Sequence, residues 1–69
     1  PRFEALRQLR QKIAREQGVP PYVIFHDATL QAMLDARPEN LEALAEVHGV
    51  GERKLERYGD AFLECLSGL

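Results

Sequence analysis

The sequence is poor in the residues that usually build catalytic and metal sites. Among 69 residues there is one cysteine, Cys65, which excludes an internal disulfide and a cysteine-based metal cluster. We expect Cys65 to be a small buried hydrophobic residue. The one serine, Ser67, and the one threonine, Thr29, lie far in sequence from His26 and His48, so no nucleophile–base arrangement is evident. With no phosphate-loop or dinucleotide fingerprint either, we expect no catalytic site, no metal and no cofactor in this domain.

Long apolar runs and export signals are also missing. No stretch approaches the ~20 apolar residues of a membrane span, and no signal peptide is visible. The length allows one small domain, so we expect residues 1–69 to form a single monomeric domain without a membrane partner. Because the chain begins at Pro1 rather than methionine, we expect it to be excised from a longer protein. The low cysteine usage and the lack of export signals favour a cytoplasmic parent.

Charge is distributed unevenly although the net charge is only −2. Residues 1–18 hold five basic and two acidic side chains, a net of +3, whereas residues 26–48 hold one basic and five acidic side chains, a net of −4. The sequence therefore predicts a polarised domain with a basic first segment and an acidic middle.

Most of the chain has helical periodicity. Apolar side chains recur at three- and four-residue steps up to Ile13, and Gly18 follows as a helix stop. Asp27 is the expected N-cap of a helix over 28–36, which Pro38 closes, and Asn40 is the expected N-cap of the next short helix. The inward side chains expected on these helices are Phe3, Leu6, Leu9 and Ile13, then Leu30, Met33 and Leu34, then Leu41, Leu44, Ala45 and Val47.

The last helical pattern runs from Glu52 to the end of the chain, and Gly59 interrupts it. Glycine costs about 1 kcal/mol relative to alanine within a helix. We therefore expect a bend or break at Gly59, or a neighbouring helix packed so close that no side chain fits. The inward positions of this segment are Leu55, Tyr58, Phe62, Leu63 and Leu66.

The stretch "GVPPYVIFHDATL" resembles a strand but has no second strand to pair with. Because Pro20 and Pro21 fix the backbone, we expect a rigid extended crossover or a single helical turn. Val23 and Phe25, or Ile24 instead, are expected to fill the core between the first two long helices. The predicted fold is all-α, a compact bundle of about five short helices with a 3₁₀ or extended crossover after the first.

Two features indicate binding. Gly49, Val50 and Gly51 lead directly into a helix, so their backbone N–H groups could cradle a phosphate. The alternative is a tight turn with Val50 packed inward, and the two interpretations are compatible. Arg53, Lys54 and Arg57 follow this turn.

Tyr22 is the second feature, because it follows two prolines beside the basic helix. An exposed tyrosine on a stiff turn can stack on an unpaired base while Lys12 or Arg15 holds the backbone. The alternative is a half-buried tyrosine that covers the core.

Three stretches in this order and spacing resemble the HRDC domain (helicase-and-RNase-D C-terminal) in its RecQ-helicase form. They are "LRQLRQKIAREQGVPPYVIFHDATL", the short helix after Pro38, and "HGVGERKLERYGDAFL". The resemblance covers nearly the whole chain and implies about five helices with a short 3₁₀ turn after the first. It also implies an auxiliary module that tunes the DNA substrate choice of a 3′–5′ DNA helicase, whose ATP and magnesium site lies elsewhere in the parent chain.

In this family, basic residues of the first helix and the tyrosine after the prolines contact single-stranded or partly duplex DNA. The resemblance therefore implies contacts at Arg7, Lys12, Arg15 and Tyr22, with Arg53, Lys54 and Arg57 as a neighbouring basic group. It also implies a bacterial nucleoid-associated location if the parent is a bacterial RecQ.

The negative net charge supports a second hypothesis, because affinity for DNA depends steeply on the phosphates neutralised. Asp35, Glu39, Glu42 and Glu46, here called the acidic face, can share one exposed surface. This face is either merely solvated or docks on the basic surface of the helicase core or of a sister HRDC domain, in competition with DNA.

Overall fold

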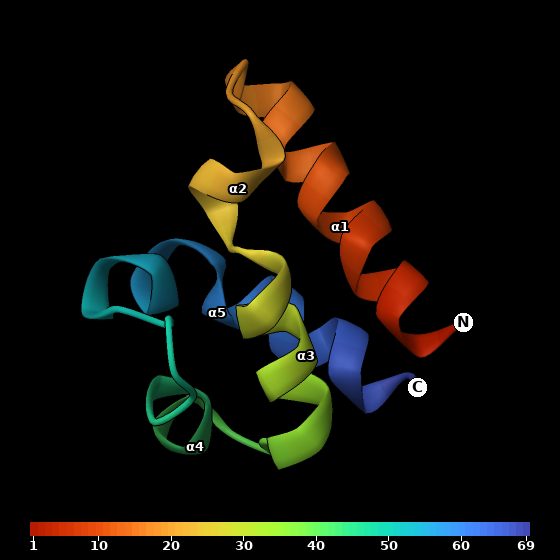
Figure 1. Ribbon diagram of the computed structural model, residues 1–69. Helices are drawn as coiled ribbons and strands as arrows, with labels where there is room; N and C mark the ends of the chain where they lie inside the picture. The colour runs from red at the N-terminus through yellow and green to blue at the C-terminus, as the bar shows by residue number, and fades with distance from the viewer.

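The computed structural model describes all residues 1–69 and contains five helices and no strand (Figure 1). Helix α1 packs against α2, α3 and α5, and α4 packs against α5. The expected all-α bundle of about five helices is confirmed. The helices are α1 (Arg2–Gln17), α2 (Pro21–Ile24), α3 (Asp27–Ala36), α4 (Leu41–Ala45) and α5 (Glu52–Ser67).

Helix α1 ends where the sequence predicts. Gly18 adopts the left-handed conformation (φ 68°), and its N–H caps the carbonyls of Ala14 and Arg15. The innermost residues of α1 are Leu6, Arg10 and Ala14, whereas Phe3, Leu9 and Ile13 are only partly buried. An arginine thus occupies the middle of the buried face, which apolar periodicity alone did not indicate.

The proline-rich stretch forms one turn of α-helix rather than a 3₁₀ turn, with Pro20 and Phe25 extended on either side. Ile24 and Phe25 are fully buried, so these two side chains fill the core at the crossover. The expectation for Val23 is wrong, because its side chain is 41% exposed. A helical turn directs consecutive side chains about 100° apart, and here Ile24 faces the core while Val23 points toward solvent.

Asp27 does not cap α3 as expected. It is the first residue of the helix, His26 occupies the N-cap position, and no side chain caps the helix there. The Asp27 carboxylate instead contacts Arg10, with 2.7 Å between Oδ1 and Nη1. The Asp27 carboxylate therefore pairs with Arg10 of α1 instead of capping α3. As an acidic group in the first turn, it still interacts favourably with the helix dipole.

The connection to α4 follows the prediction more closely. Asn40 Oδ1 accepts a hydrogen bond of 2.8 Å from the Ala43 N–H, so the predicted N-cap is confirmed. Leu44 and the following Val47 are buried as expected. Leu41 (40% exposed) and Ala45 are more exposed than the periodicity predicts, although Leu41 still contacts α5 at Gly59.

Helix α5 continues through Gly59 without a break. A Cβ at this glycine would lie 2.8 Å from Leu41 Cδ2, so the alternative of a closely packed neighbour is the correct one. The glycine lets α4 approach α5 at the cost of helix propensity.

Aromatic rings join the crossover to α5. The Phe25 ring meets the Phe62 ring edge-on, with centroids 5.0 Å apart, and Tyr58 at 6.1 Å. The Tyr58 hydroxyl donates a hydrogen bond to Gln17 Oε1 at 3.0 Å, which ties α5 to the end of α1. The first half of α5, the crossover and the end of α1 therefore form one packed unit.

Leu6→Ala should lower the free energy of unfolding by about 2–5 kcal/mol, because Leu6 is fully buried and its truncation leaves a cavity. Leu9→Ala is the matched control, since it is the same change on the same helix at a partly buried position, and it should cost less. Urea unfolding followed by far-UV circular dichroism measures both. A larger loss for Leu9→Ala than for Leu6→Ala would contradict this description of the core.

Candidate nucleic-acid interface

Tyr22 projects from the single turn of α2 and is 59% exposed. The alternative in which it covers the core is therefore wrong, and its ring is free to meet a ligand. Its ring lies nearly parallel to that of His26, with an interplanar angle of 25° and centroids 5.9 Å apart. The two rings together form an aromatic platform at the end of the molecule where α1 meets α2.

His26 was not among the predicted contact residues. The sequence indicated only an isolated surface histidine, and its side chain is indeed exposed. No local sequence signal indicated the ring contact, because α2 ends at Ile24 and the extended Phe25 and His26 break the helical spacing between the two rings.

The basic residues predicted on α1 are all exposed, but they differ in availability. Arg7 pairs with Glu4 on the same helix, with 3.2 Å between Nη1 and Oε2. Lys12 and Arg15 take part in no ion pair, so they remain free to meet a phosphate. At roughly 100° per residue, Arg15 lies between Arg7 and Lys12 around the helix.

The predicted glycine turn is tight, and Val50 packs inward with 7% exposure. Gly49 has φ +91°, and a Cβ there would collide with the Thr29 side chain, so this position requires glycine. Gly51 is the N-cap of α5, so no side chain caps the first N–H groups of this helix. The inward-packing alternative holds for Val50. The phosphate interpretation stays a prediction, and Glu52 in the first turn of α5 would oppose an anion there.

A shallow hollow of about 480 Å³ borders this turn, lined by residues 49–54. Arg53 is exposed, whereas Lys54 is partly buried and its Nζ lies 5.6 Å from the centre of the Phe25 ring. Phe25 directly precedes His26, but its ring is buried while the His26 side chain is exposed. Arg57 is exposed one turn further along α5.

The acidic face lies elsewhere. Asp35, at the end of α3, and Glu42, on α4, are exposed, as are Glu39 and Glu46. None of the four takes part in an ion pair, and only Asp35 has a side-chain partner, accepting a hydrogen bond of 3.2 Å from Gln31. Figure 1 shows α4 and the end of α3 at the bottom of the bundle, away from α2 at the top. The charge polarity expected from the sequence is thus a polarity of the folded molecule.

The remaining titratable groups gather into no arrangement typical of catalysis or metal binding. No group of three or more histidine, cysteine or carboxylate side chains is placed to hold a metal ion. Cys65 is partly buried rather than fully buried, and this burial raises the pKa of its thiol, which disfavours the nucleophilic thiolate. No helix has both the length and the apolar character that crossing a membrane requires.

Comparison with known proteins places this geometry in a family. The model of the HRDC domain family matches residues 1–66. Among solved structures, that of D. radiodurans RecQ HRDC domain 3 superimposes with a TM-score of 0.93 at 40% identity, covering 97% of this chain and 88% of that chain.

Two groups of similar curated proteins are helicases by name. The ATP-dependent DNA helicase RecQ of Bacillus subtilis is 50% identical over 62 residues, which are 90% of this chain and 10% of that protein. The ATP-dependent DNA helicase UvrD2 of Mycobacterium tuberculosis is 43% identical over 63 residues, which are 91% of this chain and 9% of that protein. The chain thus spans about a tenth of the length of these relatives.

The resemblance of the three sequence stretches is confirmed by the family match and by the superposition over nearly the whole fold. The chain belongs to the HRDC family, a non-catalytic auxiliary domain found in RecQ helicases.

Proposed function

We propose that this HRDC domain binds single-stranded or partly duplex DNA weakly and thereby tunes the substrate choice of an ATP-dependent DNA helicase of which it is part. The observation that carries the proposal is the exposed Tyr22 ring, held on a proline-led turn and stacked with His26. Aromatic side chains on a stiff turn bind unpaired bases without sequence preference. ATP and magnesium would act in the helicase core of the parent chain.

Cations on two sides of the platform support this role. Lys12 and Arg15 on α1 are exposed and unpaired, and Lys54 at the start of α5 lies against the ring of Phe25, the residue before His26 in the chain. A strand whose base stacks on Tyr22 can therefore place neighbouring phosphates near either group. Binding stays weak because the net charge is −2 and few phosphates are neutralised, so we expect a Kd near the non-specific range of about 10⁻⁴ to 10⁻⁶ M.

Tyr22→Ala should weaken binding of a fluorescein-labelled oligothymidine by about 1–3 kcal/mol, the usual worth of one base–aromatic stack. Tyr22→Phe is the matched control, because it keeps the ring and removes only the hydroxyl, and it should bind nearly as well as the unchanged chain. Fluorescence anisotropy at low salt measures the affinities. If Tyr22→Ala binds like the unchanged chain while its circular dichroism is also unchanged, the stacking proposal fails.

The acidic face supports a second candidate function, docking on a basic surface of the helicase core or of another HRDC domain. The supporting observation is that its four carboxylates are exposed without ion pairs at the end of the bundle away from the platform. Such an arrangement mainly sets encounter rate and orientation. Docking here would leave Tyr22 accessible, so the two functions are spatially compatible.

Replacing Glu39, Glu42 and Glu46 together by lysine should weaken the association of this domain with the helicase core of its parent chain. The matched control replaces Glu16, Glu56 and Glu64, which are also exposed, and changes the net charge equally without touching the acidic face. Titration calorimetry below and above ~0.15 M salt measures the association, since screening acts over about 8 Å at that concentration. Equal effects of both triple replacements, or an association insensitive to salt, would show that the face is merely solvated.

A further inference from the structure

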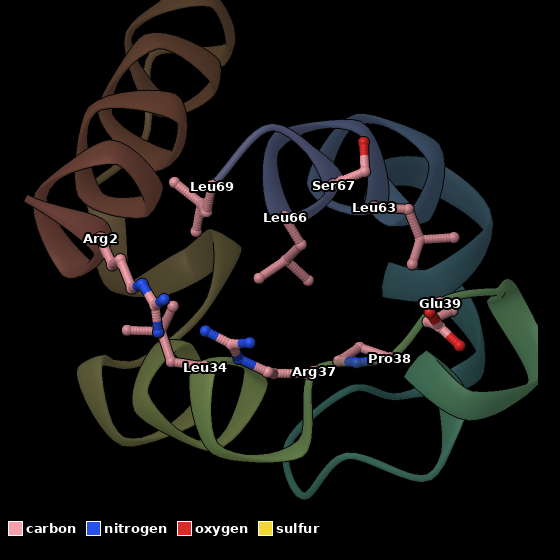
Figure 2. A pocket seen from close by; sticks show the side chains of 9 residues that line it. All are labelled: Arg2, Leu34, Arg37, Pro38, Glu39, Leu63, Leu66, Ser67 and Leu69. Atoms are coloured by element: carbon pink, nitrogen blue, oxygen red, sulfur yellow. The ribbon is translucent and has the colours of Figure 1, made fainter.

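A second hollow lies where the start of α1, the end of α3 and the end of α5 meet. Its volume is about 400 Å³, within the usual range of ligand sites. Figure 2 shows the side chains around it, which come from three separated parts of the chain. The lining residues are Arg2, Leu34, Arg37, Pro38, Glu39, Leu63, Leu66, Ser67 and Leu69.

Leucine side chains form the apolar part of this hollow. Leu34, Leu63 and Leu66 pack against the core on one side and are only partly buried, and Leu69 is 44% exposed. Figure 2 shows the Leu66 and Leu69 side chains directed into the open space. Leucine side chains from α3 and from the end of α5 thus supply the apolar part of a lining that also contains polar groups.

The charges at the rim are not balanced within the chain. Arg2 and Arg37 are exposed, and neither takes part in an ion pair. In Figure 2 both guanidinium groups lie on the Leu34 side of the hollow, whereas Glu39 lies on the opposite side near Leu63. One side of the apolar surface therefore presents two free cations, and guanidinium groups pair well with carboxylates.

Arg37 also has an unusual backbone. It ends α3 with φ 49° and is the one non-glycine residue with a positive φ. Glycine or asparagine normally occupies this left-handed position, because a Cβ is unfavourable there. A long cationic side chain is thus held at the rim despite the backbone cost, and such outliers often mark functional sites.

We propose that this hollow docks an acidic, leucine-rich peptide segment of a protein partner. Carboxylates of the segment would pair with Arg2 and Arg37 while its apolar side chains cover Leu66 and Leu69. Nucleic acid fits less well, because phosphates would leave the leucine side chains uncovered. The site is independent of the proposed DNA contact, which involves the other end of α1 and the crossover.

The test uses the ¹⁵N-labelled chain and a synthetic peptide of about twelve residues with glutamates and leucines at helical spacing. Heteronuclear NMR titration should shift the amide signals of Leu34, Arg37 and Leu66. Arg2→Gln and Arg37→Gln should each weaken binding about two- to fivefold, as expected for exposed ion pairs. Leu69→Ser, which alters an exposed position and spares the core, should weaken binding comparably.

Arg15→Gln is the matched control for charge, because it also removes one arginine from α1, at a position about 20 Å along the helix from Arg2. It should leave peptide binding unchanged while lowering oligothymidine binding, and Arg37→Gln should do the reverse. This crossed pattern separates failure of the docking site from failure of the proposed DNA contact.

Three outcomes would overturn the docking proposal. Equal binding of a peptide with lysine in place of glutamate would remove the role of charge complementarity. Shifts of the same amides by oligothymidine alone would assign the hollow to nucleic acid. Concentration-dependent dimerisation in sedimentation, abolished by Arg37→Gln, would make a second copy of this chain the occupant.

Discussion

A buried arginine holds the crossover against the first helix, and the proposed contact surface depends on it. Arg10 is 8% exposed, its Nη1 donates a hydrogen bond of 3.0 Å to the Phe25 carbonyl, and it pairs with Asp27 at 2.7 Å. These contacts fasten the chain on both sides of His26. Phe25 in turn packs edge-on against Phe62, so the polar link and the aromatic core fix the same segment. Tyr22 is thereby presented to solvent on a turn with little freedom to move.

The bundle separates surfaces of different chemistry. Stiff aromatic rings and unpaired cations lie where α1 meets α2, and carboxylates lie on α4 and the end of α3. The leucine-lined hollow with Arg37 at its rim lies where the chain's two ends come together, and it shares Glu39 with the acidic face. Binding at the acidic face or in the hollow would leave the aromatic platform accessible, so the proposed DNA and protein contacts are compatible.

Local patterns predicted the elements well and their long-range contacts poorly. Helix ends at Gly18 and Asn40 follow from capping chemistry, which involves only neighbouring residues. The burial of Arg10 and the diversion of Asp27 from its cap position depend on a contact between α1 and α3, which periodicity does not encode. For the candidate site, Tyr22 with Lys12 and Arg15 was identified from the residues themselves and lies on the surface, whereas His26 became evident only from the ring geometry.

The free energy of unfolding of Arg10→Met tests most directly whether the guanidinium holds the crossover. Methionine can fill much of the space but leaves the Phe25 carbonyl without its donor, so a loss of about 1–3 kcal/mol is expected. Asp27→Asn should cost less than about 1 kcal/mol, because the Asp27 side chain is 73% exposed and returns to water. An Arg10→Met chain as stable as the unchanged one would contradict the account.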